Sequence, residues 1–376
     1  MPNLKNIYRL GVKEMWSLLR NPMMLMLILY SFSLDLYVAA TAVPDSIAKA
    51  AIAVVDEDNS PFSAQLLSAF QMPYFMPPTL TTSKAMDEGM DHGTYTFGVD
   101  IPPNFQRDLL AGRSPQIQLN VDATQMSQAF TGNGYISQII STEVNQFLSR
   151  QRTDLPQPVD LDMRIRYNPN LVAAWFSAIN EVVNNITMLS IILVGAAVLR
   201  EREEGTMEHI LAMPVAPSEI MLSKVLSMGL VVFLATLGGV VGVIQFGLQV
   251  PITTHSLMLF MGCTVVFLLS TTALGIFLAT LSRSMPQFAI LMVLVLLPLQ
   301  MLSGGATPRE SMPEVLQYIM LVAPTTHFVS AAQATLLRNA GMSTIWPQFL
   351  SITAITAVLF FVSLVRFRKS TTDSGG

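Results

Sequence analysis

Two adjoining stretches of the sequence decide the fold. Residues 177–199 read SAINEVVNNITMLSIILVGAAVL, and residues 200–220 read REREEGTMEHILAMPVAPSEI. The first stretch is long enough to cross a bilayer core of about 30 Å, which needs roughly 20 apolar helical residues. The second is densely charged before it breaks at a glycine and several prolines. This pattern predicts a membrane-spanning helix that ends in a short, charged segment outside the bilayer.

The composition of the whole chain agrees with an integral membrane protein. Of 376 residues, 51% are hydrophobic and 12% are charged, whereas globular domains carry roughly 25% charged residues. The mean hydropathy is +0.50. So few charges could not cover a soluble protein of this size, and so apolar a chain would not remain disordered. The segment 44–170 is net acidic and the remainder slightly basic, which argues against a nucleic-acid-binding protein.

Six segments have the length and apolarity of membrane spans. They are residues 22–43, 177–199, 226–247, 257–281, 288–303 and 348–365. The fifth is short, and we expect Pro298 to interrupt it. The sequence therefore predicts an α-helical integral membrane protein with six transmembrane helices and both termini on one side.

The distribution of Lys and Arg orients these spans. The basic residues that flank them are Lys5, Arg9, Lys13, Arg20, Arg200, Arg202, Lys224, Arg283, Arg366, Arg368 and Lys369. The loop 248–256 has no basic residue, and 304–347 has only Arg309 and Arg338. The clusters all fall on one face if both termini are cytoplasmic. The tail 371–376 is then cytoplasmic, and the segment 44–170 lies outside.

Residues 1–21 form an amphipathic segment ahead of the first span. At about 100° per residue, one arc holds Leu4, Ile7, Tyr8, Met15, Leu18 and Leu19. The opposite arc holds Lys5, Arg9, Trp16, Lys13 and Arg20. We interpret the segment as a helix on the cytoplasmic leaflet; an ordinary basic flank is the alternative. Residues 40–42, ATA, resemble a signal-peptide cleavage site, but the long basic region favours an uncleaved first span.

The segment 44–170 alternates between strand-like and helix-like patterns. Strands are predicted over 51–56, 95–100, 116–122 and 161–167, and helices over 62–70, 104–111 and 125–151. The sequence thus predicts an inserted α/β extracytoplasmic domain between the first two spans. Pro73, Pro77 and Pro78 indicate a rigid loop, which is either a contact surface or a plain connector.

Motifs for catalysis and for metal or nucleotide binding are absent from the sequence. The histidines, His92, His209, His255 and His327, lack metal-ligand spacing, and there is no P-loop or nucleophile elbow. Residues 302–306, LSGGA, look like an ATPase signature, yet they directly follow an apolar span and indicate a turn at paired glycines. The single cysteine, Cys263, lies in an apolar run and should pack as a small hydrophobe. We expect no enzyme activity, metal or cofactor in this chain.

Two acidic residues are predicted at membrane depth. Asp35 lies inside the first span, and Glu181 lies near the outer start of the second. An intramembrane carboxylate is costly and is a functional candidate by default. Equally, both residues are tolerated without a function if they lie in the wet outer interface.

The charged stretch 200–220 has helix-breaking and helix-capping residues at the spacing expected for a docking element. Gly205 and Thr206 offer a break and an N-cap, a short helix is predicted over 207–213, and Pro214 ends it. A further helix should begin near Pro217. The alternative is a solvated loop, but a loop does not explain the spacing of the glycine and the prolines.

At this stretch the sequence resembles the permeases of type-2 ABC exporters. That superfamily carries the pattern R-E-x-E-x-G-T-x-E-x-[IL]-x-x-x-P, matched here by Arg200, Glu201, Glu203, Gly205, Thr206, Glu208, Ile210 and Pro214. Further similarity covers residues 167–170 (YNPN), 298–304 (PLQMLSG), Pro308, Met312, Pro313 and 324–328 (PTTHF). The resemblance extends over essentially the whole chain and is strongest to the YhhJ-like subgroup, which has a large periplasmic domain.

The resemblance implies a role and a set of partners. Such permeases lie in the bacterial inner membrane, dimerise, bind an ABC ATPase subunit that holds the ATP, and move amphiphilic cargo outward, as in multidrug efflux. The second permease half is the same chain or a different one. Drug-export relatives also work with a periplasmic adaptor, which the domain 44–170 could contact.

The resemblance also implies roles for particular segments. The coupling helix to the ATPase is 201–213, which includes Glu204, and Arg200 and Pro214 on either side of it are further coupling residues. Residues 3–20 are the connecting helix. Residues 171–370 form the rest of the transmembrane domain. Outer re-entrant helices are expected at 312–322 and 325–339 within 304–344, after a turn at Ser303, Gly304, Gly305 and Pro308. Two rival functions remain open: an envelope-assembly scaffold acting through its outer domain, and an ion channel or ion-coupled carrier.

Overall fold

The chain folds into two compact units. The computed structural model describes residues 3–42, 50–72, 74–122, 126–151, 172–206, 214–307, 309 and 312–373. One unit combines Met1–Val43 with Ile165–Gly376, and the other is Pro44–Arg164. The predicted strand 161–167, the coupling helix 207–213, Pro73 and Pro308 lie outside the described residues.

Within the part of the first unit that the structure describes, six helices are long and apolar enough to cross a membrane, as predicted. They are Pro22–Thr41 (α2, Pro22–Tyr30; η1, Ser31–Asp35; α3, Leu36–Thr41), α8 (Ala173–Glu203), Pro217–Gly247 (α10, Pro217–Gly239; η2, Val240–Gly247), α11 (Thr254–Leu281), α12 (Met285–Leu302) and α15 (Met342–Asp373). The segments η1 and η2 are π-helical. The predicted interruption at Pro298 is wrong, because α12 continues through it. A proline removes only one helical hydrogen bond, and membrane helices tolerate this loss.

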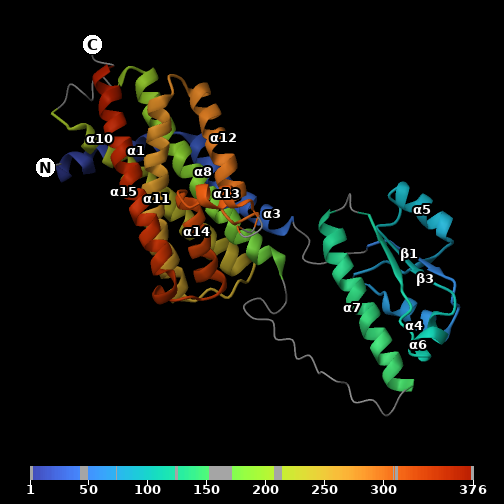
Figure 1. Cartoon of the computed structure of the whole chain (residues 1–376). Helices are drawn as coiled ribbons and strands as arrows, with labels where there is room; N and C mark the ends of the chain where they lie inside the picture. Colours follow the sequence, from blue (N-terminus) through green and yellow to red (C-terminus); the bar gives the residue numbers. More distant parts are fainter. Residues whose placement is uncertain are drawn as a thin grey trace. The chain divides into compact units, whose positions relative to one another are not determined.

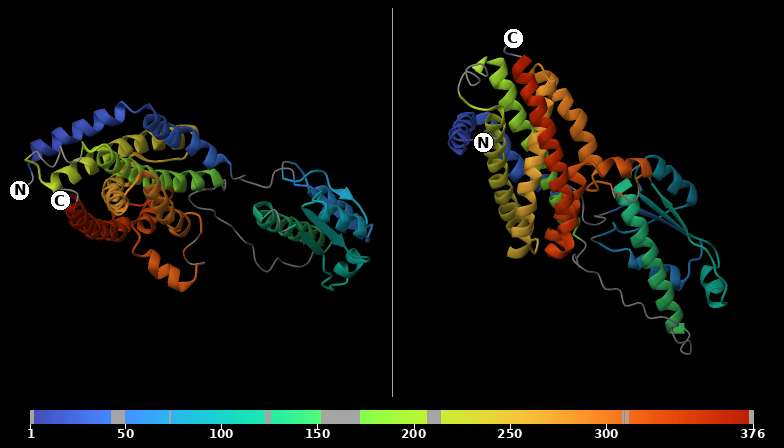
Figure 2. Two further views of the ribbon diagram at one scale, coloured as in Figure 1. Left: turned by 90° about the horizontal axis from the view of Figure 1, so that it is seen from above. Right: turned by 60° about the vertical axis from the view of Figure 1, so that its left-hand side comes forward.

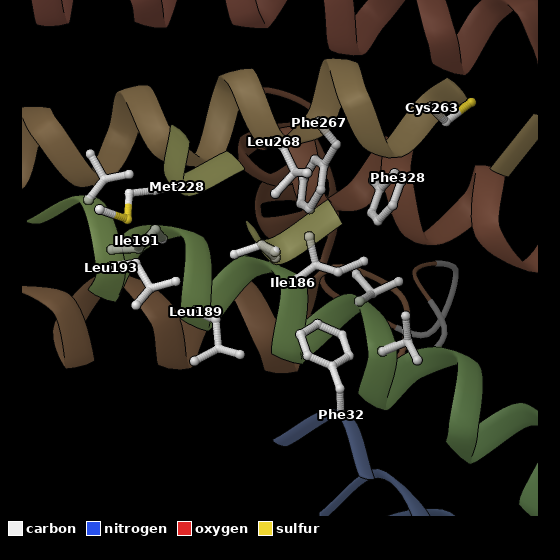
Figure 3. Packing of buried hydrophobic residues seen from close by; sticks show 14 of the residues in the cluster. Phe32, Ile186, Leu189, Ile191, Leu193, Met228, Cys263, Phe267, Leu268 and Phe328 are labelled. Atoms are coloured by element: carbon white, nitrogen blue, oxygen red, sulfur yellow. The ribbon is translucent and has the colours of Figure 1, made fainter. Parts of the chain in front are cut away.

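The helix α8 forms the centre of the helical unit. Of its most apolar stretch, 78% is buried, against 11% for α12 and 17% for α15. It packs closely on α11, because a side chain at Gly275 would meet the backbone of Ile191 at 2.9 Å. Figure 3 shows the surrounding core, in which the rings of Phe267 and Phe328 stack with centroids 4.0 Å apart. The peripheral helices expose apolar side chains, as expected for surfaces that face lipid or a partner.

The chain re-enters the bundle after α12. The helix α13 (Glu314–Met320) is followed by α14 (Pro324–Ala332) and its π-helical continuation η4 (Gln333–Leu337). The two parts meet at 89°, close to the helices expected at 312–322 and 325–339. Counting this bent pair as one broken span would give seven crossings instead of six. The helices α11 and α15 lie side by side, and the end of α15 lies at the same end of the unit as α1 (Figure 1).

The N-terminal helix α1 (Leu4–Leu19) lies across the spans rather than along them. The right-hand view of Figure 2 shows it nearly end-on while α11 and α15 run upward. Its predicted apolar arc is divided in the structure, because Ile7 and Leu18 are buried, whereas Leu4 and Tyr8 are exposed together with Trp16. The exposed residues line a groove of about 570 Å³ between α1 and α10. Trp16 therefore belongs to the apolar surface and not, as predicted, to the basic one.

The described residues of the second unit contain a small mixed sheet of four strands in the order β2-β1-β3-β4. The strand β1 (Ile52–Asp56) pairs in parallel with β2 (Thr79–Leu80) and β3 (Phe97–Ile101), and β3 pairs antiparallel with β4 (Gln118–Val121). The helices are α4 (Pro61–Ala69), α5 (Ser83–Asp91), α6 (Phe105–Leu110) and α7 (Met126–Gln151). Rings from several elements, among them Phe62, Phe75 and Phe97, fill the core. The elements β2 and α5 were not predicted, because their segment has few apolar residues.

Candidate functional site

The charged end of α8 is the first candidate site. The helix stops at Glu203, and Gly205 follows with φ +69°, a conformation that favours glycine. The predicted break is therefore present. Thr206 Oγ1 donates to the carbonyl of Glu201 at 3.2 Å. The segment that would follow, including Glu208, lies outside the described residues, and Pro214 stands two residues before the N-cap of α10.

A buried ion network joins this end of α8 to α1 and α10. Lys224 Nζ lies 2.8 Å from Glu14 Oε1 and 2.7 Å from Glu201 Oε2. Lys13 Nζ lies 2.5 Å from Glu201 Oε1 and 3.6 Å from Glu14 Oε1. The contact to Glu201 Oε2 is an ion pair without hydrogen-bond geometry. Three side chains are at most 7% exposed, but Lys13 is 49% exposed.

The charges in this network balance, with two lysines facing two glutamates. Burial disfavours the charged form of Lys13, but its hydrogen bond and charge interactions with Glu201 and Glu14 outweigh burial and raise its pKa above the ordinary value. Removing one partner of a buried pair typically costs about 3–5 kcal/mol. The network therefore holds three helices in a fixed relation.

Further contacts tie the same end of α8 to its neighbours. Arg200 Nη2 donates to Ser17 Oγ at 2.7 Å, and Arg202 Nη1 donates to the carbonyl of Ser282 at 3.1 Å. The N–H of Met285 donates to Glu203 Oε1 at 2.9 Å. Glu203 and Glu204 are both exposed, but of the two only Glu203 makes a side-chain hydrogen bond to a described residue. Of the predicted coupling residues, Arg200, Glu201 and Glu203 thus have partners within this chain, and Glu204 faces outward.

The start of α10 is fastened to α1 in the same way. Glu219 accepts hydrogen bonds from the N–H of Asn3 at 2.5 Å and from Asn6 Nδ2 at 3.1 Å. It also accepts from the N–H of Ala216 at 3.2 Å, which closes the first turn of α10. Sequence reasoning missed Glu14, Lys224 and Glu219 as structural residues. The available signal was Lys224, a single charge within an apolar run that required a partner.

The intramembrane acids pair with asparagines near the other end of α8. Asn185 Nδ2 donates to the carbonyl of Ser31 at 2.8 Å and to Asp35 Oδ2 at 3.2 Å. Asn184 Nδ2 donates to Glu181 Oε2 at 3.4 Å. Sequence reasoning identified the two acids but missed these amides. Adjacent asparagines within an apolar span were the available signal.

The predicted outer turn lies in the same region. Gly304 has φ +93°, and the carbonyl of Gly305 accepts from Asn180 Nδ2 at 3.0 Å. The hydroxyl of Ser303 donates to the carbonyl of Leu299. Gln333 Nε2 of η4 also reaches Asn180, at Oδ1, at 3.3 Å. The turn is therefore joined through Asn180 to the central helix. Among the described residues, no three His, Cys, Asp or Glu side chains gather as a metal site.

Comparisons with known proteins agree with this architecture. The family described as "ABC-2 family transporter protein" matches residues 15–365. The inner membrane transport permease YhhJ of Escherichia coli K12 is 53% identical over 370 residues, which cover 98% of this chain and 99% of that protein. The probable multidrug ABC transporter permeases YbhR and YbhS of the same strain are 27% and 25% identical, over 95% and 89% of this chain and 96% and 89% of their own lengths. Because the family match covers residues 15–365 and the similarity to YhhJ covers 98% of the chain, this multi-pass inner-membrane protein belongs to the ABC-2 transporter family.

Proposed function

We propose that this chain is the permease subunit of an ATP-driven exporter and forms the outward path for an amphiphilic or drug-like substrate. The charged end of α8 carries the proposal. Because buried ion pairs join it to α1 and α10, a force applied at 207–213 would move three elements together. Family membership supports a transport role, and similarity to YbhR and YbhS, which are probable multidrug ABC transporter permeases, supports a drug-like cargo.

The proposed partner at this end is a separate ABC ATPase, which binds the ATP. The permease itself then needs no cofactor and catalyses no reaction. Glu204 is exposed and has no ion-pair partner among the described residues, so it is free to meet a basic groove. Residues 201–213, including Glu208, form the proposed contact.

We further propose that both termini are cytoplasmic and that residues 44–170 are periplasmic, where an adaptor could bind. The basic clusters of α1, the end of α8 and the end of α15 support this orientation. A reporter fused after Gly376 should be active only in the cytoplasm, and one inserted near Asn59 only outside. Cytoplasmic activity at Asn59 would overturn the orientation.

A second permease half is proposed to complete the path, either the same chain or a different one. The first span and α12 expose apolar faces that include Met26, Leu29, Ile290 and Leu294. Cysteines placed at Met26 and Ile290, after Cys263→Ser, should form a cross-linked dimer in native membranes. Strictly monomeric behaviour in lipid would contradict this arrangement.

The decisive experiment purifies the chain from native membranes and measures the co-purifying ATPase and its ligand-stimulated activity. Glu204→Lys should reduce both, because like charges at a desolvated contact typically cost several kcal/mol. Glu57→Lys is the matched control, since Glu57 is also exposed but lies in the α/β unit. An envelope scaffold or an ion-coupled carrier would give no ATPase with the unmodified chain. If both variants gave the same yield of ATPase, Glu204 would not be part of the contact.

A further inference from the structure

A polar pocket lies beside the turn that follows α12. It has a volume of about 330 Å³. The turn 303–306 and Arg309 form one side, Thr326, Ser330 and Gln333 of α14 and η4 form another, and Phe176 of α8 closes it. Segments far apart in sequence thus meet around one cavity.

Several hydrogen-bonding groups that line the pocket have no partner. Thr326 is 4% exposed, and its Oγ1 makes no hydrogen bond within the described residues. Burying a hydroxyl without a partner is unfavourable. The N–H groups of Gly304 and Gly305 also make no hydrogen bond to any described residue. The pocket therefore presents donors that a ligand could satisfy.

Arg309 is the only charged side chain among the described residues that line the pocket. Arg309 is half-buried and pairs with no acid among the described residues. None of the described residues that line the cavity is acidic. A guanidinium beside hydroxyl and backbone N–H donors suits a carboxylate or phosphate group. Phe176 and Val329 add an apolar wall to the same cavity.

We propose that this pocket binds the anionic head group of an amphiphile, a phosphate or carboxylate carried on a hydrophobic chain. Arg309 and the hydroxyl of Thr326 hold the head group, and Phe176 contacts the start of the chain. This proposal rests on the proposed export function only where it identifies the bound amphiphile as the cargo. Head-group binding itself requires no ATPase.

The test measures binding to the purified full-length chain in detergent by native mass spectrometry. The probes are lysophosphatidic acid, lysophosphatidylcholine with the same acyl chain, and dodecanoate. We expect Arg309→Gln to weaken binding of lysophosphatidic acid by about tenfold, and Thr326→Val by about fivefold. Arg338→Gln is the control, since Arg338 is exposed and does not line the pocket. Unfolding temperatures should match for all variants.

Two outcomes would overturn the proposal. One is equal affinity for the anionic and the zwitterionic lysolipid, and the other is unchanged affinity in Arg309→Gln. A second arm adds the same probes to the complex with its ATPase. Faster ATP hydrolysis, lost in Arg309→Gln, identifies cargo, whereas binding without stimulation identifies a resident lipid and overturns the cargo assignment. Because the first arm contains no ATPase, failure of head-group binding is distinguishable from failure of the export function.

Discussion

The two ends of α8 bury polar groups in opposite ways. At the C-terminal end, Glu201 is held by two lysines at 2.5 and 2.7 Å, and full charges balance within a closed network. Towards the N-terminal end, Asn180 and Asn184 make neutral or singly charged contacts of 3.0–3.4 Å. Near them Thr326 has no partner within the described residues. One end is fixed by strong pairs, and the other keeps donors available.

This difference separates two physical tasks along one helix. A closed network of buried charges resists rearrangement, because removing one of its members leaves the positive and negative charges unbalanced. Amide contacts of moderate strength rearrange at a much smaller cost. The C-terminal end is therefore suited to transmitting a displacement, and the N-terminal end is suited to adapting to a ligand.

The largest expected effect comes from breaking the charged network. Lys224→Met should destabilise the fold by about 3–5 kcal/mol, because Glu14 and Glu201 lose their shared cation. Thermal unfolding in detergent measures the change. Lys224→Met combined with Glu14→Gln should recover much of the loss, since Glu201 keeps Lys13. Equal stability of the single and double variants would show that the pairs are not coupled.

At the opposite end, Asn185→Leu should have a smaller effect of about 1–3 kcal/mol. The substitution removes the donors to the carbonyl of Ser31 and to Asp35. The control is Asn184→Leu, because Asn184 makes only one longer contact, of 3.4 Å to Glu181 Oε2. Asn185→Asp would not serve as a control, because it would place a second carboxylate beside Asp35. An equal loss in both leucine variants would contradict the proposed importance of Asn185.

A substitution at Gly205 tests whether the left-handed turn directs the segment beyond it. Gly205→Ala should cost roughly 1–2 kcal/mol at φ +69° and lower the yield of co-purifying ATPase. Gly205→Asn should be tolerated better, because asparagine adopts this conformation more readily. If alanine and asparagine behave alike, backbone conformation at this position does not control coupling.

The smallest effect is a pH dependence at Lys13. Its pKa is raised from 10.5 in the folded protein, so the stabilisation is fully present below pH 10.5 and is lost as the pH rises through the folded-state pKa. Solvent screening at this half-exposed lysine keeps the effect small. The difference in unfolding temperature between the unmodified chain and Lys13→Gln should shrink from pH 8 to pH 11. A constant difference would show that Lys13 acts through packing alone.

The sequence predicted what depends on local periodicity. Hydropathy found the six spans, and the glycine with its flanking charges located the end of α8. The ion network could not be found this way, because Lys13 and Glu201 are 188 residues apart and Lys224 and Glu14 are 210 apart. The assignment of Trp16 to the basic surface of α1 was wrong for the same reason, because the position of α10 decides which residues of α1 are buried. The pocket at Arg309 likewise requires segments that only the fold brings together.

The balanced network at the end of α8 also limits how this sequence can change over evolutionary time. Its four charges come from three helices, yet each depends on the others for compensation. A lineage that loses Lys224 alone passes through a poorly folded intermediate. Substitution of Lys224 is therefore expected only together with a compensating change at Glu14 or Glu201. Positions that are far apart in the gene should then change together.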